Sequence, residues 1–143
     1  PQVRYVENAP DGYVVNDLLI DFEGRLFGQQ LVIELYSGSI YQDALGGENP
    51  PNPAFFPVAP SLEADSYVTI GGVGTAASDQ LIIGGSTELG TSSPKQFDTA
   101  GVDIAWSPAP GIIVEDGVDF PIARVTLSDD ATGRFWLYSN VDG

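Results

Sequence analysis

Apolar and polar residues alternate along several short segments of the chain, the pattern of β-strands with one buried face. The clearest alternation lies in residues 13–23, where every second residue from Leu18 to Phe22 is apolar. Residues 30–36 repeat it after a glycine-containing turn. Because both segments are long and adjacent in sequence, they predict an antiparallel sheet with one buried face.

Further strands are expected wherever apolar segments return between turn residues. These segments are 66–71, 80–83, 102–106, 112–114, 120–127 and 134–139, and a turn is expected at 115–117. The alternation in 102–106 directs Val102, Ile104 and Trp106 inward, and the last two segments are expected to form a hairpin. No segment keeps a helical period. About eight or nine short strands predict an all-β protein, a single antiparallel β-sandwich of jelly-roll or cohesin-like type.

One long Pro-rich loop interrupts the strand pattern at residues 37–65. Its Pro50-Pro51-Asn52-Pro53 run excludes a central strand, because proline cannot donate to a β-ladder. Loops of this length are often functional, and its aromatic residues predict that it packs over a sheet end. We therefore expect an extended N-terminal arm at 1–12 and a β-sandwich domain at 13–143.

The composition limits the class of protein, its partners and its compartment. The chain has 143 residues, 17 Gly, 11 Pro and 43% hydrophobic residues, which fits one folded domain with many turns. Its net charge of −15 disfavours nucleic acid and anionic membranes as partners. No apolar run is long enough to span a membrane. A chain that begins with Pro1 and contains no Cys is expected to be a processed, secreted form without disulfides.

Several segments share a combination of Gly, Pro, aromatic and acidic residues. They are residues 37–43 (SGSIYQD), 46–47 (GG), 49–56 (NPPNPAFF), 61–69 (SLEADSYVT), 121–130 (PIARVTLSDD) and 133–136 (GRFW). Together they resemble secreted proteins of planctomycete-type bacteria that carry a cohesin-like β-sandwich. The resemblance spans most of the chain from about Tyr13 and implies an extracellular, jelly-roll-like domain. Neither a dockerin-like calcium repeat nor an apolar sorting tail is expected. We do not predict that this chain binds dockerins as cohesins do.

Catalytic side chains are scarce. The chain has no His and no Cys, so a serine nucleophile lacks its usual base. Glu63 and Asp65 would share a face of an extended segment, and glycosidases use such a carboxylate pair. With 20 acidic residues, chance pairs are expected, and no enzymatic activity is predicted.

Acidic turns are the candidates for calcium. One contains Glu115, Asp116 and Asp119, and another contains Asp129 and Asp130. Neither has the spacing of an EF-hand loop. We expect solvated turn residues and no cofactor, with calcium left as an open alternative.

Exposed aromatic rings could bind carbohydrate. Tyr41, Trp136 and Tyr138 are the ligand-binding candidates, and Tyr36 and Trp106 are further aromatic residues that could serve. The alternative is that these rings pack in the core or under the long loop. A Ser/Thr-rich tract could carry O-glycans, and its residues are Ser86, Thr87, Thr91, Ser92 and Ser93.

The N-terminal arm is a candidate for association between copies of the chain. Val3, Tyr5 and Val6 are the self-association candidates, because an extended arm can pair with its own sheet or with a neighbour. The leading hypothesis is an extracellular structural protein, a self-assembling subunit of a cell-surface layer or filament. The alternative is an extracellular module that binds carbohydrate or a protein partner.

Overall fold

The computed structural model describes residues 2–7, 9–84 and 95–142, and this part of the chain is all-β with no α-helix. The predicted all-β, antiparallel class is confirmed. The described strands are β1 (Gln2–Arg4), β2 (Tyr13–Ser37), β3 (Tyr67–Val68), β4 (Gln80–Gly84), β5 (Gln96–Phe97), β6 (Gly101–Pro108), β7 (Glu115–Ser128) and β8 (Thr132–Val141). Three 3₁₀ turns accompany them: η1 (Pro53–Phe55), η2 (Pro60–Ala64) and η3 (Ala77–Asp79).

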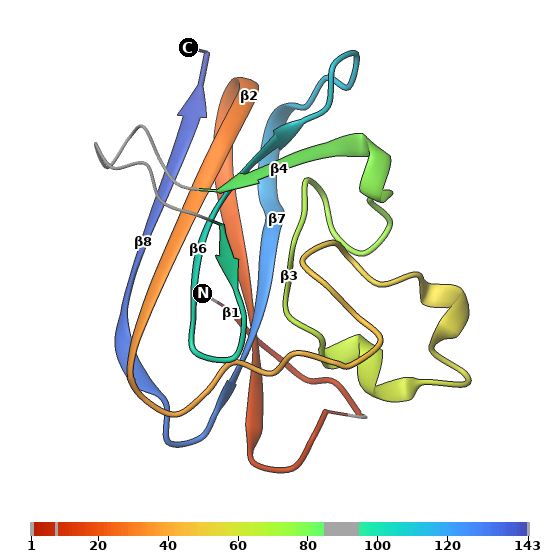
Figure 1. Ribbon diagram of the computed structural model, residues 1–143. Helices are drawn as coiled ribbons and strands as arrows, with labels where there is room; N and C mark the ends of the chain where they lie inside the picture. The colour runs from red at the N-terminus through yellow and green to blue at the C-terminus, as the bar shows by residue number, and fades with distance from the viewer. Residues whose placement is uncertain (1, 8, 85–94, 143) are drawn as a thin grey trace.

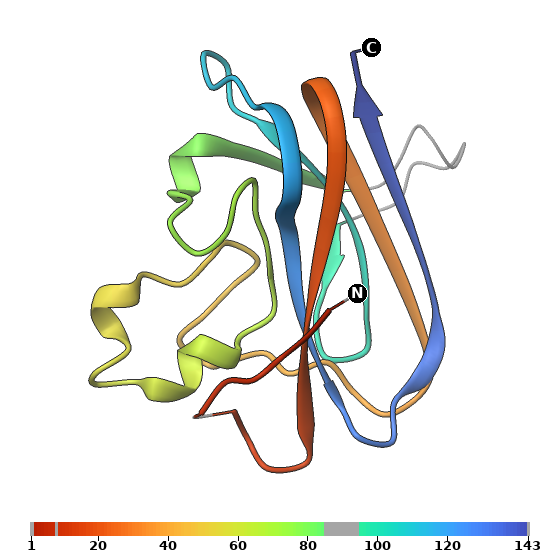
Figure 2. The ribbon, with the colours of Figure 1, turned by 180° about the vertical axis from the view of Figure 1, so that it is seen from behind.

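Strand β2 organises the fold, because it folds over and contributes to two layers (Figure 1, red to orange). Its first half pairs with β1 on one edge and β7 on the other, and β7 also pairs with β3. Its second half pairs with β6 and β8, and β6 continues to β4 and β5. The sheet therefore curls into a half-barrel whose two layers face each other, as Figure 2 shows from behind.

The fold-over in β2 depends on Gly24. Its φ is +86°, a conformation that side chains disfavour, and an added Cβ would lie 2.0 Å from Oδ2 of Asp142. The backbone N–H of Gly24 donates to Asp116 at 2.8 Å, and that of Arg25 donates to Asp142 at 3.0 Å. Carboxylates from the ends of β7 and β8 thus hold the bend in place.

The core lies between the two layers. Leu18 and Leu31 enter it from the two halves of β2, and Ile104 and Trp106 from β6. Trp106 is 2% exposed, and its ring N–H donates to the carbonyl of Thr69 at 2.9 Å. The inward directions predicted from alternation are confirmed for Leu18 and Leu31 of β2 and for Val102, Ile104 and Trp106 of β6.

The predicted hairpin between β7 and β8 is wrong. No pairing joins these strands in the described chain: β7 pairs with the first half of β2, and β8 pairs with the second half. Because β2 folds over, both of its ends reach the β7–β8 turn, with Tyr13 opposite Ser128 and Ser37 opposite Thr132. The turn therefore carries the chain from one layer to the other.

Two smaller predictions before β7 are also wrong. Residues 112–114 form no strand, although Ile112 and Val114 pack against the core. The expected turn at 115–117 lies within β7, where Asp116 has a φ of 52° and the register with β2 shifts. Short apolar segments do not distinguish a strand from core-packed coil, which explains the first error.

The Pro-rich loop forms a lobe, defined here as residues 41–66, to one side of the half-barrel (Figure 1, right). It lies along the edge of β7 rather than over a sheet end. The N–H of Tyr41 donates to Thr126 at 2.8 Å, and the N–H of Thr126 donates to the Ser66 hydroxyl at 2.9 Å. Both ends of the lobe thus continue the sheet beyond β7.

Candidate functional site

The N-terminal arm, defined as the described residues before β2, pairs with its own chain. In β1, Gln2, Val3 and Arg4 lie opposite Asp17, Asn16 and Val15 of β2. We call these three β2 residues the seat. This ladder has three residue pairs and leaves all of β1 exposed to solvent.

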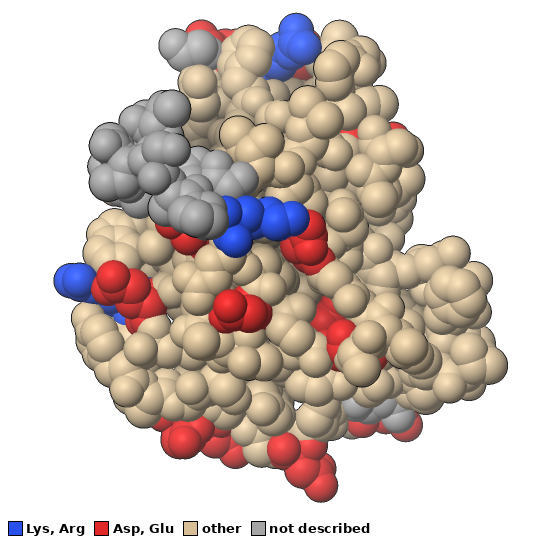
Figure 3. All heavy atoms as spheres, viewed as in Figure 1, with Lys and Arg blue, Asp and Glu red and all other residues tan. Residues whose placement is uncertain are grey.

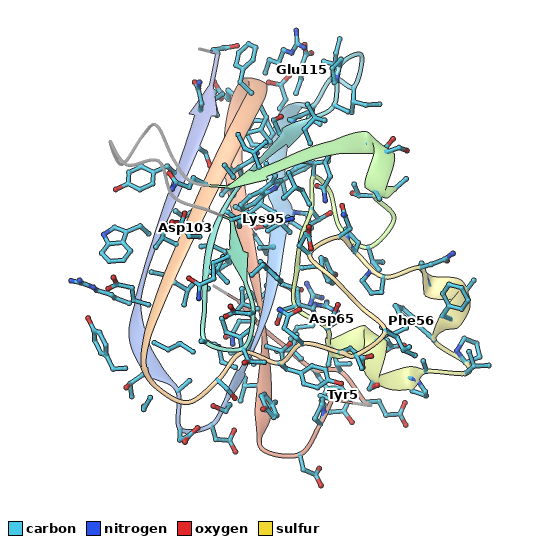
Figure 4. All side chains as sticks on the ribbon, viewed as in Figure 1. Tyr5, Phe56, Asp65, Lys95, Asp103 and Glu115 are labelled. Carbon is cyan, nitrogen blue, oxygen red and sulfur yellow. The ribbon has the colours of Figure 1, made fainter. Side chains whose placement is uncertain are left out.

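Most of the described side chains of the arm are exposed to solvent. Val3 is 69% exposed and Tyr5 is 86% exposed, whereas Val6 is half-buried. Figure 4 labels Tyr5 in the lower part of the molecule, beneath the lobe side of the fold. Of the predicted self-association residues, two therefore present apolar surface without burying it.

Asp17 is the anchor of the seat. One of its oxygens accepts Nε of Arg124 at 2.8 Å, and the other accepts Nε of Arg4 at 2.9 Å. Its side chain is 8% exposed, so a carboxylate here needs cationic partners. Arg124 also donates to the carbonyl of Glu63 at 2.7 Å. Burial alone would lower the pKa of Arg124, but the hydrogen bond to Asp17 and the nearby charges of Asp17, Tyr67 and Glu63 together raise it. Two of the five basic residues of the chain thus meet at one carboxylate.

Between β1 and β2 the chain makes a compact connection. Ala9 N–H donates to the carbonyl of Val6 at 3.2 Å, and Tyr13 N–H donates to Pro10 at 3.2 Å. Gly12 has a φ of +82°, and its carbonyl accepts from Asp129. Two turn hydrogen bonds and one hydrogen bond from the β7–β8 turn thus hold this connection.

A cavity of about 360 Å³ opens between the two layers beside the arm. Its walls are mainly apolar and include Leu35, Leu127 and Phe135, the last of which is 47% exposed. Asn16 also lines it, and Val3 lies on the same sheet face because directly opposed residues share a face. Val3 therefore points toward the side on which the cavity lies.

The predicted ligand-binding residues do not form one site. Trp136 and Tyr138 share the outer face of β8, opposite Val32 and Gln30 of β2. The Arg134 guanidinium lies 4.7 Å from the centre of the Trp136 ring. Figure 4 shows aromatic rings projecting from the outer side of β8.

Tyr41, in contrast, belongs to the lobe beside the other layer. It packs edge-on against Tyr13, with ring centroids 5.5 Å apart. Its hydroxyl donates to Asp43 at 2.7 Å. These contacts give Tyr41 a packing role.

The acidic candidates have local structural partners. Glu63 lies in a 3₁₀ turn rather than an extended segment, so it does not share a face with Asp65. Asp65 is fully buried, and the carboxylate paired with it is Asp43, whose backbone N–H it accepts at 2.8 Å. Glu63 and Asp65 therefore do not form the carboxylate pair on one face that the sequence suggested.

The acidic turns also make local hydrogen bonds. Asp116 accepts from Gly24, Asp119 donates its N–H to Asp21, and Asp130 accepts the Ser128 hydroxyl. In the described part of the chain, no three Asp or Glu residues are grouped so as to hold a metal ion. Acidic side chains are spread over the face in Figure 3 rather than gathered in one patch. The Ser/Thr-rich residues from Ser86 to Ser93 lie outside the described residues.

Sequence reasoning missed the Asp17 anchor and the Asp43–Asp65 pair. Arg4 was the available signal for the first, as the one basic residue of a very acidic chain that lies in the arm. The second pair is separated by 22 residues of irregular chain, and no periodicity connects them.

No family model, curated protein or solved structure matches this chain. The resemblance to planctomycete-type secreted proteins stays a prediction. Within the described residues, no helix has the length and apolar character that crossing a membrane requires.

Proposed function

We propose that the chain is an extracellular structural subunit that self-associates by exchanging its N-terminal arm between copies. The arm's three-pair ladder and the Arg4–Asp17 ion pair carry this proposal. An arm from a second copy can make the same contacts at the same seat. The extracellular setting rests on the sequence resemblance, and the non-enzymatic role rests on the lack of His and Cys.

Releasing the arm is inexpensive. Each backbone hydrogen bond contributes about 0.5–1.5 kcal/mol net, and an ion pair with an exposed partner contributes about 0–1 kcal/mol. Opening the three-pair ladder therefore costs on the order of a few kcal/mol. Exchange restores the same contacts, so this cost is an activation barrier rather than a net loss.

Arm exchange can join copies into an open chain of subunits. The donating arm and the accepting seat are different surfaces, so each copy gives one and receives one. Contacts of this heterologous kind build filaments when they do not close into a ring. Since a short linker gives the chain's own arm an effective concentration in the millimolar range, exchange needs a crowded setting such as a cell surface.

Sedimentation velocity near 1 mM protein in high salt tests the proposal at this effective concentration. We expect wild-type chains to form species larger than a monomer. Arg4→Glu should remain monomeric, because it places a carboxylate against buried Asp17. Arg134→Glu is the matched control, since it makes the same charge change at a solvent-exposed ion pair on β8.

Two results would contradict the proposal. One is wild-type protein that stays monomeric under these conditions. The other is Arg4→Glu protein that assembles as well as the control. Circular dichroism of each variant confirms that folding is retained.

Carbohydrate binding at the outer face of β8 is the second candidate. It is favoured by Trp136 and Tyr138 on one sheet face, with Tyr36 on the neighbouring strand 67% exposed. Flat rings can stack on sugar faces, and the Arg134–Glu34 pair offers polar groups beside them.

A glycan array tests this candidate. Binding that disappears in Trp136→Ala but survives in Phe27→Ala would support it. Phe27 is the matched control, because it is an exposed ring with the Arg25 guanidinium 5.2 Å from its centre. Equal loss in both variants, or no binding by wild type, would reject carbohydrate recognition at this face.

A further inference from the structure

The lobe is fastened by two aspartates from its two ends. Asp65 is 0% exposed, and its Oδ1 accepts the backbone N–H of Asp43 at 2.8 Å. Its Oδ2 is buried and has no hydrogen-bond partner among the described residues. Figure 4 labels Asp65 on the side of the lobe that faces the half-barrel. A buried carboxylate with one unpartnered oxygen is costly in its charged form.

Asp43 differs from Asp65 in its partners. It accepts the Tyr41 hydroxyl at 2.7 Å, the Ser61 hydroxyl at 2.6 Å and the N–H of Leu45 at 3.0 Å. Burial alone would raise its pKa, but these hydrogen bonds together hold the pKa of Asp43 below its usual value. The negative charge of the pair therefore belongs on Asp43, and the proton belongs on Asp65.

The surroundings of Asp65 favour a proton over a metal ion. Gly46 packs so closely that an added Cβ would lie 2.0 Å from Oδ2. A calcium ion needs six to eight oxygen ligands, and both Oδ1 of Asp65 and the Asp43 carboxylate already accept hydrogen bonds. A proton requires neither space nor further ligands.

We propose that protonated Asp65 is a clasp that joins the two ends of the lobe where they meet β7, and that its ionisation as the pH rises releases the lobe. The titratable groups around it are Asp43, Tyr41 and Tyr67. Arg124 lies over the Tyr67 ring but donates to Asp17 and to the Glu63 carbonyl. The hydrogen bonds of Arg124 therefore go to groups other than Asp65.

The direction of the pH effect follows from burial. Burial is the largest cause that raises the pKa of Asp65, from 3.8 to about 7, and the nearby Asp43 charge adds to it. The backbone N–H of Asp43, which donates to Oδ1, offsets only part of this increase. Since the folded pKa is raised, the clasp's contribution is complete below pH 3.8 and declines up to about pH 7. Release is therefore favoured toward neutral and alkaline pH.

Release would change the surface beside β7. The Tyr41–Thr126 and Thr126–Ser66 hydrogen bonds would open, leaving backbone groups of a sheet edge unpaired. The lobe also carries exposed apolar side chains, with Leu45 at 75% and Val58 at 81% exposure. The clasp thus controls a second edge, independent of the arm and its seat.

Hydrogen exchange at pH 5.5 and pH 8.5, corrected for intrinsic rates, tests the clasp. For wild type we expect local opening of residues 43–66 to increase roughly 30-fold between these pH values, as the shift from 3.8 to about 7 requires. Peptides from β6 should show a smaller change. Asp65→Asn should abolish the pH dependence, and Glu63→Gln, the matched control in the same turn, should retain it.

A direct titration covers the case in which Asp65→Asn does not fold. Carboxyl carbon NMR of the wild type should give an Asp65 midpoint near 7. A midpoint below 5, or opening that does not depend on pH, would overturn the proposal. Suppression of alkaline opening by millimolar calcium would also overturn it, since that result would identify a cation site.

Discussion

Strands β1 and β8 both pair with β2, but the fold holds them very differently. β8 makes ten residue pairs with the second half of β2, and its Leu137 packs against the core. β1 makes three pairs with the first half and buries none of its side chains. The comparison teaches that one strand belongs to the frame of the half-barrel, whereas the other is attached to it by few contacts, as the proposed exchange requires.

The largest expected effect separates these two strands by stability. Leu137→Ala should lower the free energy of unfolding by about 2 kcal/mol, because it removes apolar contacts from the core. Val3→Ala should change it by less than about 0.5 kcal/mol, because Val3 is exposed. Urea denaturation measures both. Similar losses for the two variants would show that β1 is part of the frame.

The bend that gives β2 its two halves provides the next test. Gly24→Ala should destabilise the protein by about 1–2 kcal/mol from its positive φ alone, with the Asp142 contact adding to this. Gly47→Ala is a suitable control, because no atom lies within 4 Å of its added Cβ. Thermal unfolding of the two variants checks the difference, and equal melting temperatures would argue against a strained bend.

A change in salt concentration should have the smallest effect, and it tests only the proposed exchange of β1. Chains with a net charge of −15 repel each other, and raising NaCl from about 0.05 to 0.5 M screens this repulsion. The dissociation constant for assembly should fall several-fold, as measured by sedimentation. Weaker assembly in high salt would mean that the Arg4–Asp17 attraction outweighs the repulsion between chains.

The frame was largely predictable from sequence, because strand alternation is a local signal. Leu18, Leu31 and Trp106, which alternation predicts to point inward, all lie in the core. The β7–β8 hairpin was not predictable in the same way. Its turn residues suit a hairpin, yet the strands pair with β2 because β2 folds over at Gly24. Tertiary pairing overrode the local turn signal.

The candidate sites were less predictable. The arm could be recognised as extended, but its seat depends on the burial of Asp17 and on Arg124 arriving from β7. The Asp43–Asp65 clasp joins two positions across an irregular loop. Alternation says nothing about contacts of this kind, because each is created by the packing of distant segments.

Cross-linking between chains tests arm exchange most directly. The chain has no Cys, and Val3 lies opposite Asn16 in a pair whose Cα separation suits a disulfide. Val3→Cys and Asn16→Cys proteins, prepared separately, are mixed at high concentration and oxidised. We predict a disulfide-linked heterodimer on a non-reducing gel, with little product when Ala105→Cys replaces Asn16→Cys. If the Val3→Cys/Asn16→Cys double variant closes its own disulfide while the mixture yields no heterodimer, the arm stays on its own chain and the exchange account is contradicted.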